Sequence, residues 1–114
     1  MDGIVFDSKL EMNAYRVLRD RGVKFDRQIE FTIQERFEHD GKIIRPIKYV
    51  ADFKVYALDG TPFIIDTKGM ITPDCKLKLK LMLAQGNEVH CVKTLGELAT
   101  FLAEHNCLPA SVNA

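Results

Sequence analysis

The stretch from residue 49 to residue 69, YVADFKVYALDGTPFIIDTKG, carries two aspartates within two apolar runs and a lysine shortly after the second. Asp52 interrupts the first run, Asp66 ends the second, and Lys68 follows it. Carboxylates on neighbouring strands bind hard cations such as Mg²⁺, which takes a few carboxylate oxygens and keeps several waters. A lysine beside them orients a water or stabilises charge that develops on a phosphate. These residue types indicate metal-assisted phosphodiester hydrolysis.

Whether the two aspartates meet depends on the loop between the runs. With a turn of only two residues, Asp52 lies opposite Thr67, and the aspartates point to opposite sides of the sheet. With a loop of three residues that ends at a left-handed Gly60, Asp52 lies opposite Asp66 and shares a face with it and with Lys68. The Cβ atoms of the aspartates are then about 4.5–5.5 Å apart, and the like charges repel unless a cation lies between them.

Each of these residues also has a simpler explanation. An aspartate in a strand often faces solvent at a sheet edge, and the short pattern DxK occurs by chance in many proteins. The second aspartate at matching parity, Gly69 and a lysine-bearing segment after it favour the catalytic interpretation.

The segments before this hairpin predict a helix and strands. Apolar residues at helical spacing after Ser8, and Gly22 as a stop, predict a first helix in which Ser8 and Glu11 form a capping box. Alternating apolar residues predict a half-buried strand over 23–33. The pair Asp40-Gly41 marks a turn between two extended runs.

The segments after the hairpin predict two helices and a strand. Thr72 as N-cap, a proline after it and Gly86 as a stop predict a helix, although the alternation KLKLKL also suits a strand. EVHCV is a short strand, and Thr94 caps a final helix. The order predicts a single α/β (α+β) domain over 1–107, with a central mixed sheet flanked by helices and a flexible tail over 108–114.

Composition restricts the class of protein. A chain of 114 residues with 46% hydrophobic and 28% charged residues fits one globular domain. The formal net charge is zero, so a DNA partner must meet basic groups concentrated on one face. Three cysteines without a CxxC pair, no leader-like segment and no apolar run near 18 residues predict a cytoplasmic protein without a membrane span.

The motifs VADF and IIDTKG, joined by a short hairpin, resemble those of the PD-(D/E)XK nuclease superfamily. The resemblance implies a restriction-endonuclease-like αβββαβ core. It also implies that Asp52 and Asp66, with the Thr67 carbonyl, ligate Mg²⁺, for which Mn²⁺ substitutes, and that Lys68 is the catalytic lysine. Ala51 replaces the usual proline, and Asp66 replaces the commoner glutamate; neither departure removes a ligand.

Many members of that superfamily carry a further glutamate on the first helix. Glu11 occupies the corresponding place and is implied as an additional metal ligand and catalytic residue. The capping-box role remains open beside it, because a carboxylate bonded to the Ser8 amide has fewer oxygens free for a metal.

The wider pattern looks most like small phage-encoded endonucleases related to Holliday-junction resolvases, and it is also similar to the endonuclease subunit of some heteromeric transposases. Gln28 recurs in that pattern without an assigned role. The resemblance implies a Mg²⁺-dependent endodeoxyribonuclease that acts on branched or duplex DNA in phage recombination. A homodimer is expected, because cutting two strands symmetrically requires two sites. Two alternatives remain: a non-catalytic DNA-binding protein of the same fold, and a nuclease subunit active only within a larger complex.

Basic residues near the motifs are candidates for DNA phosphate contacts. Lys76, Lys78 and Lys80 follow the hairpin, and Arg16 and Arg19 lie on the first predicted helix. For any single one of the lysines, a solvated amphipathic helix is the favoured explanation. The three histidines have no ligand spacing and receive no catalytic role.

Overall fold

The computed structural model describes residues 3–109. Its elements, in chain order, are α1 (Lys9–Asp20), β1 (Lys24–Gln34), β2 (Phe37–His39), β3 (Lys42–Ile44), β4 (Ile47–Tyr56), β5 (Pro62–Thr67), α2 (Pro73–Ala84), β6 (Val89–Val92) and α3 (Leu95–Glu104).

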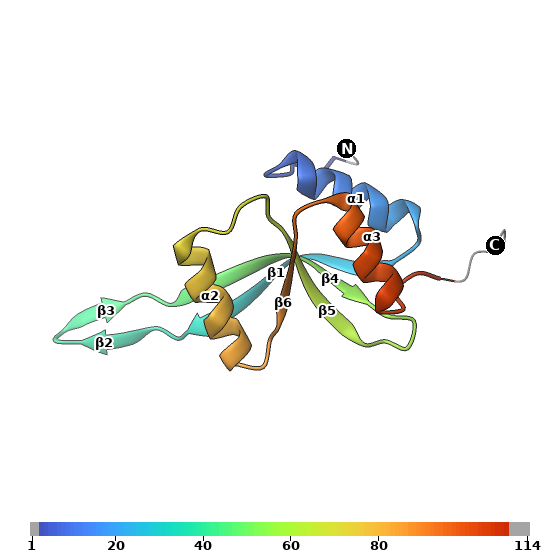
Figure 1. Ribbon diagram of the computed structural model, residues 1–114. Coiled ribbons are helices and arrows are strands. Elements are labelled where there is room, and N and C mark those ends of the chain that lie inside the picture. The colour runs from blue at the N-terminus through green and yellow to red at the C-terminus, as the bar shows by residue number, and fades with distance from the viewer. Residues whose placement is uncertain (1–2, 110–114) are drawn as a thin grey trace.

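One mixed sheet forms the centre of the fold. Its strand order is β1-β4-β5-β6, with antiparallel pairs up to β5 and a parallel pair between β5 and β6. The strands β2 and β3 form a separate two-stranded arm that projects from the sheet (Figure 1). The predicted α+β class and the αβββαβ order are confirmed, because α1, β1, β4, β5, α2 and β6 follow one another with the arm and α3 as additions.

Each helix begins at the hydroxyl residue that the sequence predicts. The side-chain oxygens of Ser8, Thr72 and Thr94 each accept a hydrogen bond from the amide three residues later, at 3.1, 3.2 and 3.1 Å. The reciprocal half of the first capping box differs from the prediction. Glu11 Oε1 accepts a hydrogen bond from the Asp7 amide at 3.1 Å. Asp7 precedes the N-cap residue Ser8, whose own amide would be the donor in a capping box.

Two apolar clusters cover opposite faces of the sheet. One contains Phe53 and Ile65 with residues of α1 and α3, and the other contains Ala51 and Ile64 with Met82 of α2. Ile64 and Ile65 are consecutive in β5, so their side chains point to opposite faces. Helices α1 and α3 therefore pack on one face, which we call the α1 face, and α2 packs on the other, the α2 face.

In β1 and β4, odd-numbered side chains point to one face of the sheet on one side of Gln28 and Asp52 and to the other face on the other side. The register of the two strands is the same on both sides of this pair, so Gln28 lies opposite Asp52. Yet Phe53 packs on the α1 face and Ala51 on the α2 face, although residues two apart in a regular strand share a face. Gln28 has φ +52, a left-handed conformation that interrupts the alternation. The strand predicted over 23–33 is thus present as β1, but its apolar residues pack into both apolar clusters, one on each face of the sheet.

The described chain continues past α3 to residue 109. Leu108, the first residue of the predicted tail, packs against the core on the α1 face. Positions 110–114 of the predicted tail lie outside the described residues.

Among the helices of residues 3–109, none has the length and apolar character needed to cross a membrane.

Candidate active site

The loop between β4 and β5 has the three-residue form that brings the aspartates level. The Ala57 amide donates to the Thr61 carbonyl at 2.8 Å, and the Gly60 amide donates back to the Ala57 carbonyl at 2.9 Å. Gly60 has φ +93, as the three-residue loop requires. The register that follows pairs Phe53 with Ile65, which places Asp52 opposite Asp66. This predicted register is confirmed.

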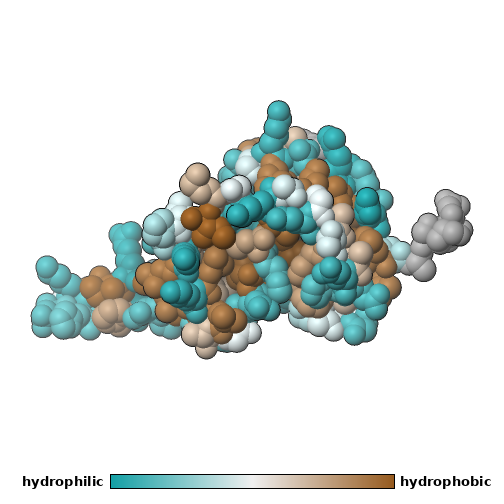
Figure 2. Space-filling view, viewed as in Figure 1, coloured by the Kyte–Doolittle hydropathy of each residue, from teal (hydrophilic) through white to brown (hydrophobic). Residues whose placement is uncertain are grey.

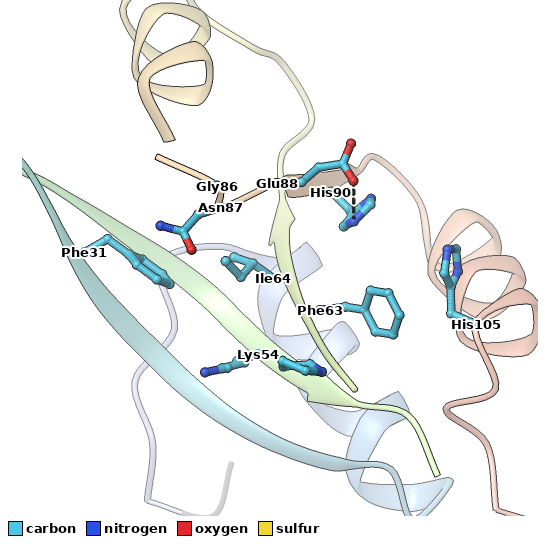
Figure 3. Close-up of a pocket in the computed structure, with 10 residues that line it drawn as sticks. Phe31, Lys54, Phe63, Ile64, Gly86, Asn87, Glu88, His90 and His105 are labelled. Carbon is cyan, nitrogen blue, oxygen red and sulfur yellow. Dashed lines mark ion pairs between the residues drawn. The ribbon is translucent and has the colours of Figure 1, made fainter. Parts of the chain in front are cut away.

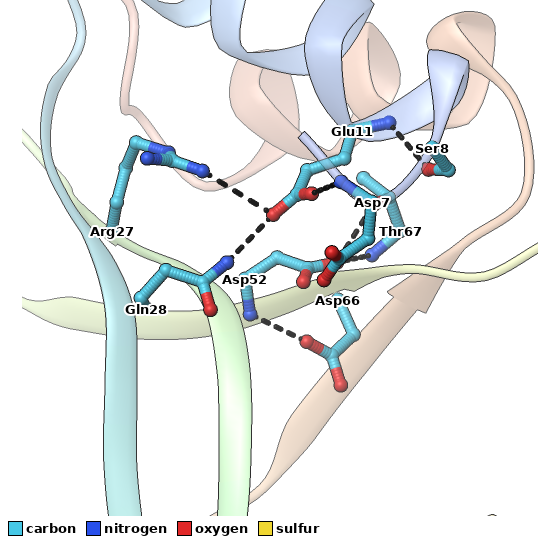
Figure 4. A network of polar contacts seen from close by, with 8 residues as sticks. All are labelled: Asp7, Ser8, Glu11, Arg27, Gln28, Asp52, Asp66 and Thr67. Carbon is cyan, nitrogen blue, oxygen red and sulfur yellow. Dashed lines mark hydrogen bonds and ion pairs between the residues drawn. The ribbon is translucent and has the colours of Figure 1, made fainter. Parts of the chain in front are cut away.

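Beyond the last β4–β5 pair, Phe53 with Ile65, aspartate side chains accept hydrogen bonds from main-chain amides of the opposite strand. The Asp52 amide donates to Asp66 Oδ1 at 2.7 Å. The Thr67 amide and hydroxyl donate to Asp52 Oδ2 at 2.9 and 2.7 Å (Figure 4). Each strand therefore binds a carboxylate of the other strand, and the two carboxylates are fixed at the junction by main-chain donors.

The two carboxyl groups do not share a face, so this part of the prediction is wrong. Asp66 lies on the α2 face, fully buried, where the Tyr49 hydroxyl donates to Oδ2 and Lys68 Nζ lies 3.4 Å from the same oxygen. Asp52 points toward Thr67 on the opposite, α1 face, and Figure 4 shows the Asp66 side chain directed away from Glu11. The physical reason is the change of face at Gln28 and Asp52, which the alternation of residue types does not reveal.

Glu11 joins Asp52 from the first turn of α1. The residue is only 2% exposed. Its Oε2 accepts from Gln28 Nε2 at 2.7 Å and lies 3.5 Å from Arg27 (Figure 4). Burial and then the charge of Asp52 raise the pKa of Glu11. Glu11 and Asp52 therefore form an acidic pair on the α1 face.

Lys68 and Asp66 form an ion pair on the α2 face. Burial raises the pKa of Asp66, against the opposing effects of the Asp52 amide and Lys68. Burial lowers the pKa of Lys68, but the charges around it, Asp66 foremost, outweigh burial and raise that pKa above its usual value. Asp66 thus favours the protonated, positively charged form of Lys68.

The acids fit a hard cation in type and in charge. Carboxylate oxygens are the ligands that Mg²⁺ prefers, and a cation would offset the charge that burial makes costly in Glu11 and Asp66. Within residues 3–109, no group of three or more histidine, cysteine or acidic side chains is disposed to hold one ion. The acids are arranged as the Glu11–Asp52 pair and a separate Asp66.

Two residues of this site carry no strong signal in the sequence. Tyr49 is 5% exposed and bonds Asp66, but a tyrosine in an apolar strand is ordinarily a core residue. Arg27 fits a DNA-facing basic residue by type alone. In the structure its guanidinium lies 4.6 Å from the Phe6 ring centre and contacts Glu11, so it offsets charge inside the site.

The predicted DNA-binding residues lie on both sides of the sheet. Lys76 and Lys80 are exposed on α2, and Lys78 forms an ion pair at 3.8 Å with the aspartate one turn earlier. Arg16 and Arg19 are exposed on α1. Because α1 and α2 pack on opposite faces, the arginines and the lysines flank the site from two sides and do not form one helical surface.

A pocket of about 380 Å³ lies apart from these acids. Its walls include Phe31, Lys54, Phe63, His90 and His105 (Figure 3). The two histidine rings lie 6.0 Å apart in an aromatic cluster, and burial lowers the pKa of His90. None of the predicted site residues lines this pocket.

These features define an α+β protein with a buried group of acids and a lysine at the point where two central strands separate. The family model described as "Protein of unknown function (DUF1064)" matches residues 1–96, and the chain belongs to that family. No curated protein and no solved structure matches the chain.

Proposed function

We propose that this protein is a Mg²⁺-dependent endodeoxyribonuclease, also served by Mn²⁺, that hydrolyses phosphodiester bonds of branched or otherwise structured DNA. The observation that carries the proposal is the junction of β4 and β5. There Asp66 pairs with Lys68 and accepts from the Asp52 amide, while Asp52 lies beside Glu11. The αβββαβ order agrees with this assignment, and phage recombination in the host cytoplasm remains its expected setting.

Each residue of the junction has a role in the proposed reaction. Glu11 and Asp52, which lie together on the α1 face, would hold the ion first. The Asp66 side chain would have to turn from the α2 face to join them with the Thr67 carbonyl, because in this structure it pairs with Lys68 and Tyr49. An ion held there would neutralise charge on the phosphate and supply an activated water. Lys68, held in its charged form by Asp66, stabilises the negative charge that grows on the phosphate oxygens.

DNA contacts are proposed for the exposed cations that flank the junction. Lys76 and Lys80 reach the backbone from one side, with Lys78 partly engaged by its aspartate, and Arg16 and Arg19 reach it from the other. Because the formal net charge of the chain is zero, this attraction is local and falls with rising salt.

A second copy of the chain is the proposed partner of the arm. Two strands of three residues each are not stable alone, and this arm exposes Phe37, Ile43 and Ile44 by 42, 58 and 37%. Figure 2 shows hydrophobic residues on the arm and beside α2. A net charge of zero allows two copies to approach without repulsion. A homodimer also provides the two sites that symmetric cleavage needs.

A second candidate is a nuclease subunit that acts only within a larger complex. It is favoured by exposed apolar residues on α2 and just before it, where Met70 follows Lys68 by two residues: Met70, Leu77 and Leu83 are exposed by 81, 56 and 58%. Such a surface beside a catalytic site suits a permanent partner of a different kind.

The test is cleavage of a four-way junction, a linear duplex and a single strand in Mg²⁺ or Mn²⁺ against EDTA. We expect metal-dependent cutting that Asp66→Ala lowers by about 100-fold or more, because the ion and Lys68 both lose their partner. Asp26→Ala, an exposed aspartate bonded to Tyr56, is the matched control and should cut as wild type does. If wild type binds DNA but cuts none of these substrates, the autonomous nuclease is excluded in favour of the subunit or of a non-catalytic DNA-binding protein of the same fold.

A further inference from the structure

Gln28 has a backbone conformation that its residue type and its position do not favour. It lies inside β1 with φ +52. Among residues 3–109, the other non-glycine residues with positive φ are Asp40 and Asn106, and both lie in turns. Aspartate and asparagine adopt this conformation more readily than glutamine does. A glutamine here is therefore retained at an energetic cost that glycine would avoid.

The side chain of Gln28 makes a contact that explains this cost. Its Nε2 donates to Glu11 Oε2 at 2.7 Å, across from β1 to the first turn of α1. The pairs on either side of Gln28 keep one register between β1 and β4, so Gln28 is also level with Asp52, the other member of the acidic pair. Arg27 lies farther from the same oxygen, at 3.5 Å, with its guanidinium placed over the Phe6 ring. The short directional bond to Glu11 thus belongs to Gln28.

We propose that Gln28 is a positioning residue: its left-handed backbone turns the side chain to α1, where its amide holds the Glu11 carboxylate beside Asp52. The length of the side chain matters, because asparagine would suit the backbone better but is one methylene shorter. The consequence for metal binding rests on the proposed function. The contact between Gln28 and Glu11 does not.

The backbone part of the proposal is tested by thermal unfolding of Gln28→Gly and Gln28→Ala. Both variants lose the hydrogen bond, and only alanine keeps a Cβ in the left-handed region. We expect the glycine variant to melt at the higher temperature. At Glu30, an exposed β1 position without positive φ, the order should reverse, because glycine weakens an ordinary strand. A Gln28→Ala protein as stable as Gln28→Gly would overturn the claim of strain.

The positioning part is tested by Mn²⁺ affinity, measured by calorimetry on the same variants. We expect both to bind Mn²⁺ about 10-fold more weakly than wild type, the usual effect of removing a group that orients a ligand. The two losses should be equal although the two stabilities differ. A merely structural role predicts instead that Mn²⁺ affinity follows stability, so that Gln28→Gly retains a higher Mn²⁺ affinity than Gln28→Ala. Wild-type affinity in either variant overturns the proposal.

The contact itself is tested without metal by a double-mutant cycle. Gln28→Ala, Glu11→Ala and the double variant are compared in urea unfolding at neutral pH. Non-additive losses of stability support the contact, and additive losses overturn it. If wild type binds no Mn²⁺, the proposed nuclease fails, while this cycle still decides whether Gln28 positions Glu11.

Discussion

Buried acids make the candidate site costly to the folded state. Asp66 is fully buried and Glu11 is 2% exposed, and burial is the foremost cause that raises the pKa of each. A raised pKa means that the folded state binds the proton more tightly than the unfolded state does. Proton binding by these acids therefore contributes to the free energy of unfolding. That contribution is fully present below the ordinary carboxyl pKa of about 4 and is lost as the pH rises through the folded-state pKa. The protein therefore holds these acids at neutral pH at the expense of stability.

Asp66→Asn should increase the free energy of unfolding at pH 7 by about 1 kcal/mol, the usual scale when a costly functional residue is neutralised. The asparagine oxygen can still accept from the Asp52 amide, and the buried charge is gone. Urea denaturation at several pH values should show the gain shrinking toward pH 4, where wild-type Asp66 takes up its proton.

The control for this experiment is Asp59→Asn. Asp59 is exposed, and hydrogen bonds from the Thr61 amide and hydroxyl lower its pKa. Its contribution has the opposite sign: it is present above the ordinary pKa and is lost as the pH falls. A gain in stability at pH 7 for Asp59→Asn as large as for Asp66→Asn would contradict the role of burial.

At the scale of elements, one loop sets the register of the site. The three-residue loop at Gly60 determines that Asp52 lies opposite Asp66 and not opposite Thr67. Glycine provides the left-handed residue without steric cost. The same hairpin with a two-residue turn would shift every side chain of β5 by one position against β4.

Gly60→Ala should lower the free energy of unfolding by about 1 kcal/mol or more, because alanine at positive φ is strained. An added Cβ at Gly60 would meet nothing within 4 Å, so the cost comes from the backbone alone. Gly69→Ala is a matched control, since that position is equally open but has no positive φ. Equal stabilities of the two variants in urea denaturation would argue against this account of the loop.

At the scale of the whole molecule, neutrality restricts the DNA contacts to local groups of charge. Replacing Lys76 and Lys80 together by alanine should weaken DNA binding and reduce the slope of log affinity against log salt by about 2. Replacing Lys24 and Lys54, whose ammonium groups both lie over Tyr56, is the matched control with the same loss of charge. Fluorescence anisotropy at several salt concentrations measures both slopes. Equal slopes would remove α2 from the DNA surface.

The arm gives a second prediction at this scale. Ile43→Lys should weaken self-association at least about 10-fold, because it places a charge in an apolar contact. Leu58→Lys changes a residue of similar exposure, 61% against 58%, on the loop between β4 and β5. Sedimentation equilibrium should show a weaker dimer for the first variant only. A monomeric wild type would exclude the arm as a homodimer contact.

Local chemistry in the sequence determined most of the elements of this protein. Ser8, Thr72 and Thr94 begin the helices where their hydroxyls can accept an amide, and Gly60 sets the hairpin register. These features depend on residues close together in the chain, and their patterns are readable there. The ion pair of Lys68 with Asp66 also follows from their spacing of two, because Lys68 comes directly after β5 and its amide still bonds the Val92 carbonyl of β6.

Only the tertiary structure decided how the acids are oriented. Odd-numbered residues of β1 and β4 change sheet face at Gln28, which has a left-handed conformation, and at Asp52, so Asp52 points to Glu11 while Asp66 points to Tyr49. The sequence alternation is the same whether the strands change face or not. Which face each residue takes depends on packing against helices far away in the chain, and that packing exists only once all the layers are assembled.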